Sequence, residues 1–348
     1  MKVIRYPEQQ LEGQEPVVLA IGFFDGVHLG HRAVLQEAIR RAREADGKAW
    51  VMTFDPHPLS VINPSSAPRL LTSPEHKCGL FEELGMDGCI LMSFDRAMQQ
   101  RSPEEFFALL AEQIPGLLRI VVGRNWTFGA GHRGNTTLLR SLAESRGIQT
   151  SVVPQVISGD GSISSTRIRE AVLMGDLEQA RSWLGRPFSL YGQVVHGHKI
   201  GRELGYPTAN VKPHNEVHLP DGIYAAQAKL DGTIYPGAAY VGCRPTFQGT
   251  TWVVEIFLLD ERFELYGRDM EIQFLRKVRD DRAFPDAAAL RAQITLDIEA
   301  VRAIRRTWDA DPGSTGPGLN TFTPSGVMAP EGPRIKATGE NSGTRRTK

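Results

Sequence analysis

Cysteine is scarce in this chain, which holds only Cys78, Cys89 and Cys243. The three are widely spaced and none belongs to a CxxC pair, so neither a disulfide framework nor a zinc site is expected. Such cysteine usage is typical of a reducing compartment. It favours a cytoplasmic protein.

Long apolar runs are missing as well. No run in the sequence approaches the roughly 20 apolar residues that span a bilayer. Residues 1–8 also lack the apolar core of a signal peptide. We therefore expect no membrane partner, in agreement with a cytoplasmic location.

An excess of charge of either sign is the third absence, because 40 Lys and Arg are matched by 40 Asp and Glu. A chain without net charge is not expected to coat nucleic acid or an anionic membrane, so an anionic ligand must be held by local groups. At 348 residues, the chain is long enough for about two domains.

Short apolar runs alternate with amphipathic stretches in the first half. Strands are expected at residues 17–22, 49–54, 89–93, 118–123 and 150–154. Helices are expected from His31 to about residue 45, after the N-caps Ser73 and Ser102, and over residues 136–146. This alternation predicts an α/β domain over residues 1–184, with a Rossmann-like, doubly wound parallel sheet whose strand ends bind the ligand.

The second half changes to strands, expected at residues 188–196, 222–230, 239–242, 251–259 and 270–278. Asp231-Gly232 predicts a tight hairpin, and apolar residues at helical spacing between Leu290 and Ile304 predict a long helix. Residues 185–308 should thus form a small antiparallel β-barrel closed by a C-terminal helix. Residues 309–348 are rich in Pro, Gly, Ser and Thr, which predicts a disordered tail.

The segment Gly-Phe-Phe-Asp-Gly-Val-His-Leu-Gly-His at residues 22–31 follows the first expected strand. Backbone N–H groups at the start of a helix, together with His28 and His31, predict a phosphate site. Such a site catalyses nucleotidyl transfer by neutralising phosphate charge. The alternative is a pair of hydrogen-bonded histidines at a helix start. The phosphate-binding candidates in this loop are Gly22, Phe24, Gly26, Gly30 and the two histidines.

A second anion site is expected at Ile-Ser-Ser-Thr-Arg-Ile-Arg, residues 163–169, which precedes a helical pattern. Its candidate ligands are Ser164, Ser165, Thr166 and Arg167. Taken alone, the same residues describe an ordinary helix cap with basic neighbours.

Two further loops follow expected strands of the same sheet. One holds Asp55, Pro56 and His57, and the other places the polar Asn125 beside Trp126 and Phe128, aromatic rings that suit stacking on a flat ligand. These six residues are therefore candidate ligand-binding residues at the carboxyl edge of the sheet. The alternative is that Trp126 and Phe128 belong to the core.

The second half carries a glycine-spaced basic loop with Gly201 and Arg202, followed by Thr208 and Asn210. Thr208 and Asn210 lie at strand spacing, so both offer an oxygen on one face to a hard cation such as Mg²⁺. A flexible hairpin is the alternative. Glu255 lies within an apolar strand, where a carboxylate is costly to bury, so it is either a general base or one half of a structural ion pair.

Together these motifs resemble the prokaryotic bifunctional riboflavin kinase/FAD synthetase family, from about Val17 to about Arg306. The matching patterns are GxFDGVHxGH, TFDPHP, VGxNxxFG, ISSTxIR, GxxxGRxLGxPTAN, RPTF and VExxxLD, in the family's order.

The resemblance implies an N-terminal FMN adenylyltransferase and a C-terminal riboflavin kinase that use ATP and Mg²⁺. His28, His31 and Arg167 would act on the phosphates, and Glu255 would deprotonate the ribityl hydroxyl. Asn125 would lie at the nucleotide site, and the flavin would be bound by Asp55, Pro56, His57, Trp126 and Phe128. The implied partners are riboflavin, FMN, FAD and ATP, with a monomer or weak homo-oligomer as the assembly. Two alternatives remain: an FAD synthetase without kinase activity, and a flavin-binding regulator without turnover.

Overall fold

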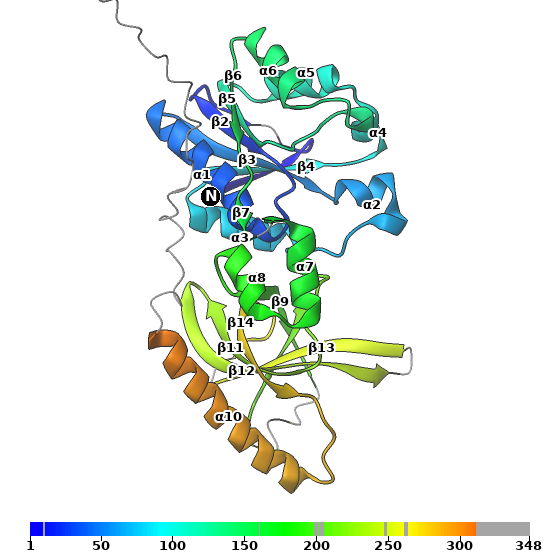
Figure 1. Ribbon diagram of the computed structural model, residues 1–348, viewed down its shortest axis with the longest axis vertical. Coiled ribbons are helices and arrows are strands. Elements are labelled where there is room, and N and C mark those ends of the chain that lie inside the picture. Colours follow the sequence, from blue (N-terminus) through cyan, green and yellow to red (C-terminus); the bar gives the residue numbers. More distant parts are fainter. Residues whose placement is uncertain are drawn as a thin grey trace, which may run out of the picture.

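The computed structural model describes residues 1–9, 11–159, 161–197, 201, 205–246, 249–260 and 264–310, with the backbone alone at 244–246 and 249–251. The first domain contains a six-stranded parallel sheet in the order β1-β4-β3-β2-β5-β6 (Figure 1). Its strands are β1 (Lys2–Tyr6), β2 (Val17–Ile21), β3 (Lys48–Asp55), β4 (Gly88–Ser93), β5 (Leu117–Gly123) and β6 (Gln149–Val153). The predicted doubly wound parallel sheet is confirmed.

Helices cover both faces of this sheet. They are α1 (Leu29–Glu44), α3 (Pro74–Leu84), α5 (Pro103–Gln113) and α6 (Thr136–Glu144), with the short α2 (Pro58–Ile62) and α4 (Arg96–Gln100) at loops. Apolar residues of α1 and α3 pack on one face, and those of α5 and α6 on the other. The β2 residues alternate between these two cores, which is why the whole strand is buried.

The second domain is a closed barrel in the order β10-β13-β12-β11-β14-β9, in which each strand pairs with its neighbours in the antiparallel direction. Its strands are β9 (Phe188–Val195), β10 (Ala209–Pro213), β11 (Gly222–Leu230), β12 (Thr233–Thr246), β13 (Gly249–Leu258) and β14 (Asp269–Asp280). The hairpin at Asp231-Gly232 is confirmed, with Leu230 opposite Thr233. The helix α10 (Ala287–Ala310) lies along the barrel and ends two residues past the predicted boundary (Figure 1). The rest of the predicted tail, residues 311–348, lies outside the described residues.

Two helices, α7 (Ser165–Met174) and α8 (Leu177–Leu184), lie between the sheet and the barrel (Figure 1). Their apolar residues share one core with the barrel interior, and Leu71 of the first domain belongs to the same cluster. The two domains are therefore joined by continuous packing.

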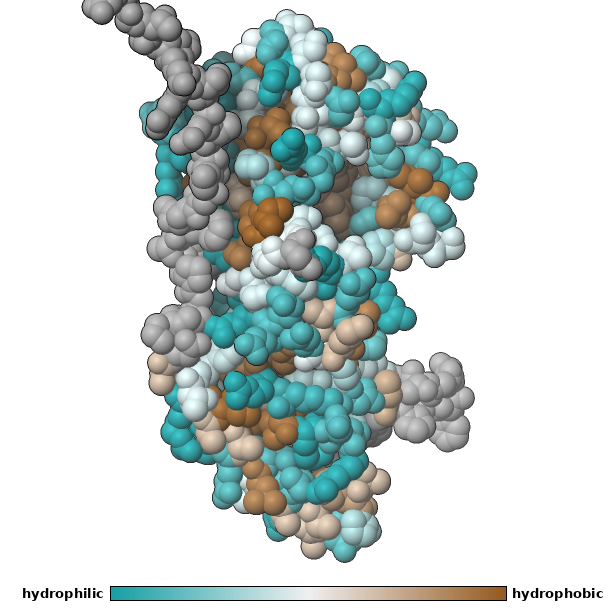
Figure 2. Space-filling model, viewed as in Figure 1, coloured by the Kyte–Doolittle hydropathy of each residue, from teal (hydrophilic) through white to brown (hydrophobic). Residues whose placement is uncertain are grey.

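The drawn face of the molecule is largely hydrophilic, with hydrophobic residues in small separate patches (Figure 2). Among the described residues, no helix is both long enough and apolar enough to cross a membrane.

Candidate active sites

The loop between β2 and α1 lies where the strand order of the sheet reverses, because β2 pairs with β3 on one side and β5 on the other. It contains the short 3-10 turn η1 (Asp25–Val27). Its backbone is left-handed at Phe24 (φ 55°), Gly26 (φ 79°) and Val27 (φ 43°). A β-branched residue rarely adopts this conformation, so the surrounding contacts must hold the loop in place.

The two histidines of the loop stack on each other. Their ring centroids lie 3.5 Å apart, with 18° between the planes. His28 caps α1 because its Nδ1 accepts a hydrogen bond from the His31 N–H at 3.2 Å. In the neutral ring the proton is therefore on Nε2, which makes that atom a donor. A Cβ at Gly30 would lie 3.1 Å from His28 Cε1, so the absence of a side chain there makes room for the stacked ring.

Both imidazoles are neutral near pH 7. Burial lowers the pKa of His28 to about 4, and the nearby charge of Arg186 acts in the same direction. Burial also lowers the pKa of His31, helped by His28 and Lys77. His31 Nδ1 is buried without a hydrogen-bond partner in the described part of the chain. A bound phosphate would favour the protonated form of these rings, since opposite charge raises the pKa of an imidazole.

Two buried charged residues, Asp25 and Lys77, form hydrogen bonds that hold the loop in place. The sequence analysis named neither of them as a site residue. Asp25 is 2% exposed and accepts hydrogen bonds from the backbone N–H groups of Leu71 and Thr72, both at 3.0 Å. Lys77 is 1% exposed, and its Nζ donates to Phe23 O at 3.2 Å. The signal for Asp25 was its place inside the motif. Lys77 gave none, because it lies in a distant helix.

The helix α7 begins at Ser165, five residues before the predicted helical pattern at Glu170. Ser164 is its N-cap, accepting from the Arg167 N–H at 3.4 Å, and Ser165 Oγ donates to Asp25 O at 2.9 Å. Ser165 therefore lies against the loop, whereas Ser164 caps its own helix. Thr166 lies exposed on the first turn of the helix.

The two arginines of this motif have different contacts. The Arg167 guanidinium lies 4.4 Å over the Trp183 ring and donates to Ser162 O at 3.1 Å. Arg169 is the cation that reaches the loop, because its Nη2 lies 3.2 Å from Asp25 Oδ2. Sequence analysis selected Arg167, whose catalytic role stays a prediction.

The flavin candidates lie on loops that follow β3 and β5, at the same sheet edge. His57 caps α2, and its ring meets the edge of Phe23 with centroids 4.1 Å apart. Asp55 ends β3 and Pro56 follows it. The first candidate flavin loop thus lies directly beside the loop of residues 22–31, which we call the phosphate loop after its predicted role.

The second candidate loop divides between exposed and core residues. Asn125 is exposed on the turn after β5. Trp126 stacks on Phe128 at 4.7 Å, and Phe128 is 6% exposed and packs towards Phe106. The core alternative thus describes the position of Phe128, while flavin contact by either ring stays a prediction.

A second set of candidate residues meets on the barrel. Thr208 Oγ1 donates to Glu255 Oε2 at 3.0 Å, and Asn210 faces Glu255 in the register of β10 and β13. A Cβ at Gly197 would lie 2.2 Å from Asn210 Nδ2, and one at Gly201 only 3.3 Å from Thr208 Oγ1. The backbone at Gly197 and at Gly201 therefore lies close to these two side chains. Arg202, predicted to bind phosphate, lies outside the described residues.

Glu255 is only half-buried, whereas its neighbours Val254 and Ile256 are fully buried. Because side chains alternate along a strand, Glu255 lies on the outer face of the barrel. The sequence analysis expected this carboxylate to be buried among apolar residues, whereas the structure places it half-buried on the outer face of the barrel. The strand is apolar on both faces because α10 packs near its outer face, where Phe257 belongs to a small cluster with Val301.

The fold and these two sites define a class of protein: a two-module transferase, with a nucleotidyltransferase-type sheet followed by a barrel that carries a hydroxyl, an amide and a carboxylate. Comparison with known families agrees. Residues 10–167 match the family model described as FAD synthetase, and residues 184–305 match riboflavin kinase.

Relatives match across both modules. The bifunctional riboflavin kinase/FMN adenylyltransferase of Escherichia coli K12 is 36% identical over 285 residues, covering 82% of this chain and 91% of the relative. The protein of the same description from Bacillus subtilis is 35% identical over 299 residues, covering 84% and 93%. A solved structure described as a macrolide-efflux protein from Streptococcus pneumoniae has a TM-score of 0.73 and 29% identity, covering 87% of this chain and 99% of that one.

The chain belongs to the family of bifunctional riboflavin kinase/FMN adenylyltransferases. The resemblance drawn from its motifs is confirmed, and the protein is a transferase with a kinase module and a nucleotidyltransferase module.

Proposed function

We propose that the first module adenylylates FMN with ATP at the loop of residues 22–31, and that the barrel phosphorylates riboflavin to FMN at Thr208, Asn210 and Glu255. The observation that carries this proposal is the stacked, neutral pair of histidines at the N-terminus of α1, beside a separate Thr–Glu contact on the barrel. One chain would thus make FMN and then consume it. We place this enzyme in the cytoplasm as a monomer or weak homo-oligomer.

In adenylyl transfer, an oxygen of the FMN phosphate attacks the α-phosphorus of ATP while the bond to the bridging oxygen of pyrophosphate breaks. No covalent enzyme intermediate is needed, so catalysis consists of positioning and charge neutralisation. His28 donates from Nε2, and His31 has a buried nitrogen without a partner in the described structure. The free N–H groups of the first turn of α1 add further donors.

In riboflavin phosphorylation, Glu255 accepts the proton of the ribityl 5′-hydroxyl as that oxygen attacks the γ-phosphorus, and ADP leaves. Thr208 holds the carboxylate through its hydroxyl, which fixes the direction of the base. The neutral oxygens of Thr208 and Asn210 are the hard ligands that Mg²⁺ accepts together with nucleotide phosphates. The close approach at Gly197 and Gly201 gives these oxygens a fixed cradle, so the residues fit the ion. Bound Mg²⁺ would neutralise phosphate charge.

Two other functions fit these residues less well. An FAD synthetase without kinase activity would not need Thr208, Asn210 and Glu255 to meet on the barrel, as they do. A flavin-binding regulator would not need a pair of histidines at a phosphate-binding helix end. The presence of both arrangements favours the two-step enzyme.

Single substitutions in the full-length protein test the division of labour. We expect His28→Ala to form FMN from riboflavin but no FAD, and Glu255→Ala to form FAD only when FMN is supplied. A mixture of the two variants should form FAD from riboflavin again. If either substitution abolished both activities, the assignment of one reaction to each module would be wrong.

A further inference from the structure

Gly26, in the middle of the phosphate loop, is held on both sides by side chains from elsewhere in the fold. Its N–H donates to Thr72 Oγ1 at 2.9 Å, and its carbonyl accepts from Arg186 Nη1 at 3.0 Å. Gly26 lies between two non-glycine residues with left-handed backbone, Phe24 and Val27. Such a backbone persists only where outside contacts hold it. These two hydrogen bonds are therefore part of what gives the loop its shape.

The segment that contains Thr72 is hydrogen-bonded to the kinase module. The backbone N–H groups of Glu216 and Val217 donate to Leu70 O at 3.0 and 3.1 Å, and Leu70 N–H donates to Glu216 Oε2 at 2.8 Å. The neighbouring Leu71 is 2% exposed and packs in the core shared with the barrel. Residues 70–72 are thus docked on the kinase module at the point where Thr72 holds Gly26.

Asn215 fixes this docked segment to a barrel strand. It is 8% exposed, and its Nδ2 donates to Leu71 O while its Oδ1 accepts from Tyr191 N–H of β9 at 2.9 Å. One side chain thereby joins β9 to the segment beside Thr72. Since both its polar ends are used, an apolar residue of similar size would break both contacts and leave the two backbone groups unpaired.

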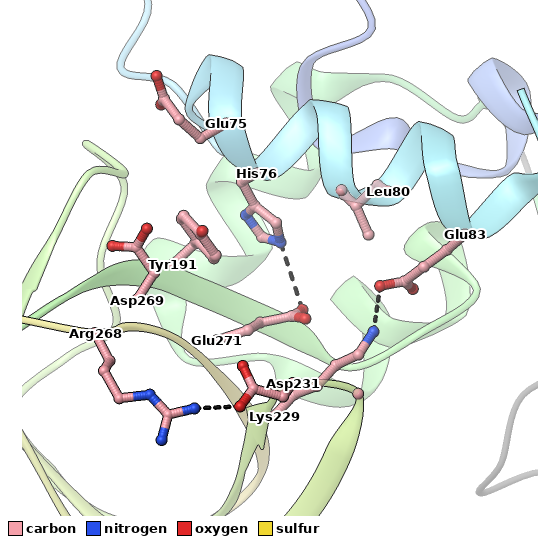
Figure 3. Close-up of a pocket in the computed structure, with 12 residues that line it drawn as sticks. Glu75, His76, Leu80, Glu83, Tyr191, Lys229, Asp231, Arg268, Asp269 and Glu271 are labelled. Atoms are coloured by element: carbon pink, nitrogen blue, oxygen red, sulfur yellow. Dashed lines mark hydrogen bonds and ion pairs between the residues drawn. The ribbon is translucent and has the colours of Figure 1, made fainter. Parts of the chain in front are cut away.

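Arg186, the other residue that holds Gly26, lies between α8 and the barrel strand β9. Burial lowers the pKa of its guanidinium to about 10, and the negative charge of Glu271 on β14 opposes this effect. Burial alone would raise the pKa of Glu271, but hydrogen bonds from His76 and Ser189 and the charge of Arg186 lower it to about 2. Glu271 is therefore ionised and lies under α3, opposite His76 (Figure 3). This buried carboxylate offsets the cost of burying the guanidinium that holds Gly26.

We infer that the kinase module positions the phosphate loop of the adenylyltransferase through Gly26, with Arg186 and Asn215 as the positioning residues. The inference rests on the proposed function of the loop. Neither residue belongs to the set Thr208, Asn210 and Glu255 that we assign to phosphorylation. Their loss should therefore slow FAD formation and spare FMN formation, although Asn215 lies within the kinase module itself.

The test uses Arg186→Met and Asn215→Leu in the full-length enzyme, with both reactions measured on the same preparation. We expect kcat for adenylylation of FMN to fall about tenfold or more in each variant, and riboflavin phosphorylation to stay within twofold of the unmodified enzyme. Arg186→Lys, which keeps a donor and the charge, should restore most of the lost rate. Phosphorylation in the same sample reports that the chain has folded.

Lys229→Gln is the matched control. Lys229 and Glu83 form another ion pair between the barrel and α3, beside a cavity of about 420 Å³ (Figure 3). Within the described part of the chain, Lys229 forms no hydrogen bond or ion pair with Thr72, Arg186 or Asn215. This substitution should leave both rates within twofold. The inference is overturned if Arg186→Met and Asn215→Leu keep adenylylation within twofold, or if both reactions fall in parallel. Absence of FAD formation by the unmodified enzyme would instead refute the proposed function of the loop.

Discussion

At the scale of single residues, the phosphate loop is held in place by charged side chains that are costly to bury. Asp25 and Arg169 form a largely buried ion pair, and Lys77 is enclosed against Phe23. Removing one partner of such a pair leaves an uncompensated charge, which usually costs about 3–5 kcal/mol. These groups are retained at a site where they shape a strained backbone next to two neutral histidines.

The depressed pKa of His28 predicts a specific acid sensitivity. The unfolded chain binds a proton on this residue near pH 6.5, but the folded protein does so only near pH 4. Stability is therefore unaffected above pH 6.5 and falls as the pH drops from 6.5 towards 4, by about 2 kcal/mol between pH 7.5 and 5. Urea unfolding at both pH values should show a loss of at least this size, because the buried His31 acts in the same direction. The variant His28→Gln should make the loss smaller by about 2 kcal/mol.

The exposed His132 provides the control for this measurement. The variant His132→Gln should keep the acid sensitivity of the unmodified protein. Equal pH dependence in His28→Gln and the unmodified protein would contradict the assignment of a buried, neutral His28.

Sequence analysis singled out the loop of residues 22–31, but it did not predict all of the contacts that shape this loop. The spacing of His28 and His31 after a buried strand was enough to place them at a helix start. The motif did not show that Gly30 makes room for the His28 ring, because that depends on the stacking of the two rings. Nor did it show that Arg169 rather than Arg167 meets Asp25, since this depends on which face of α7 packs against the loop.

At the scale of elements, apolar runs and capping residues predicted most of the strands and helices. The capping box at Ser102 and the N-cap at Ser73 are both present. The edge strand β1 and the short β10 were missed because partly exposed strands carry a weak hydrophobic pattern. The pairing of β10 with β13 is nonetheless what brings Asn210 opposite Glu255.

This strand pairing leads to a prediction for the kinase module. Thr208→Val keeps the shape of the side chain and removes the hydroxyl that donates to Glu255. We expect riboflavin phosphorylation to fall by roughly 10- to 100-fold because the base loses its orientation. Adenylylation of supplied FMN should stay unchanged. Thr233→Val, on the exposed β11–β12 hairpin, is the control and should affect neither rate.

An unchanged rate of phosphorylation in Thr208→Val would show that the hydroxyl neither orients the base nor contributes to binding of Mg²⁺ with ATP. A loss of both activities would place the effect in the fold.

At the scale of the whole molecule, the two modules are joined by a shared core and by buried polar contacts. Chain length predicted two domains, and the change from alternating helices and strands to strands alone predicted a boundary near α8. The sequence did not show that Leu71, far from the boundary, packs in the barrel core, because such contacts depend on how the finished domains dock. The docking is what connects the kinase module to Gly26.

The most direct test of the two-step account is a time course of riboflavin, FMN and FAD separated by chromatography, starting from riboflavin with Mg²⁺ and ATP. We predict that FMN rises first and FAD follows after a lag, and that a parallel reaction started from FMN forms FAD without a lag. Accumulation of FMN without any FAD, or failure to convert riboflavin while FMN is still adenylylated, would contradict the account.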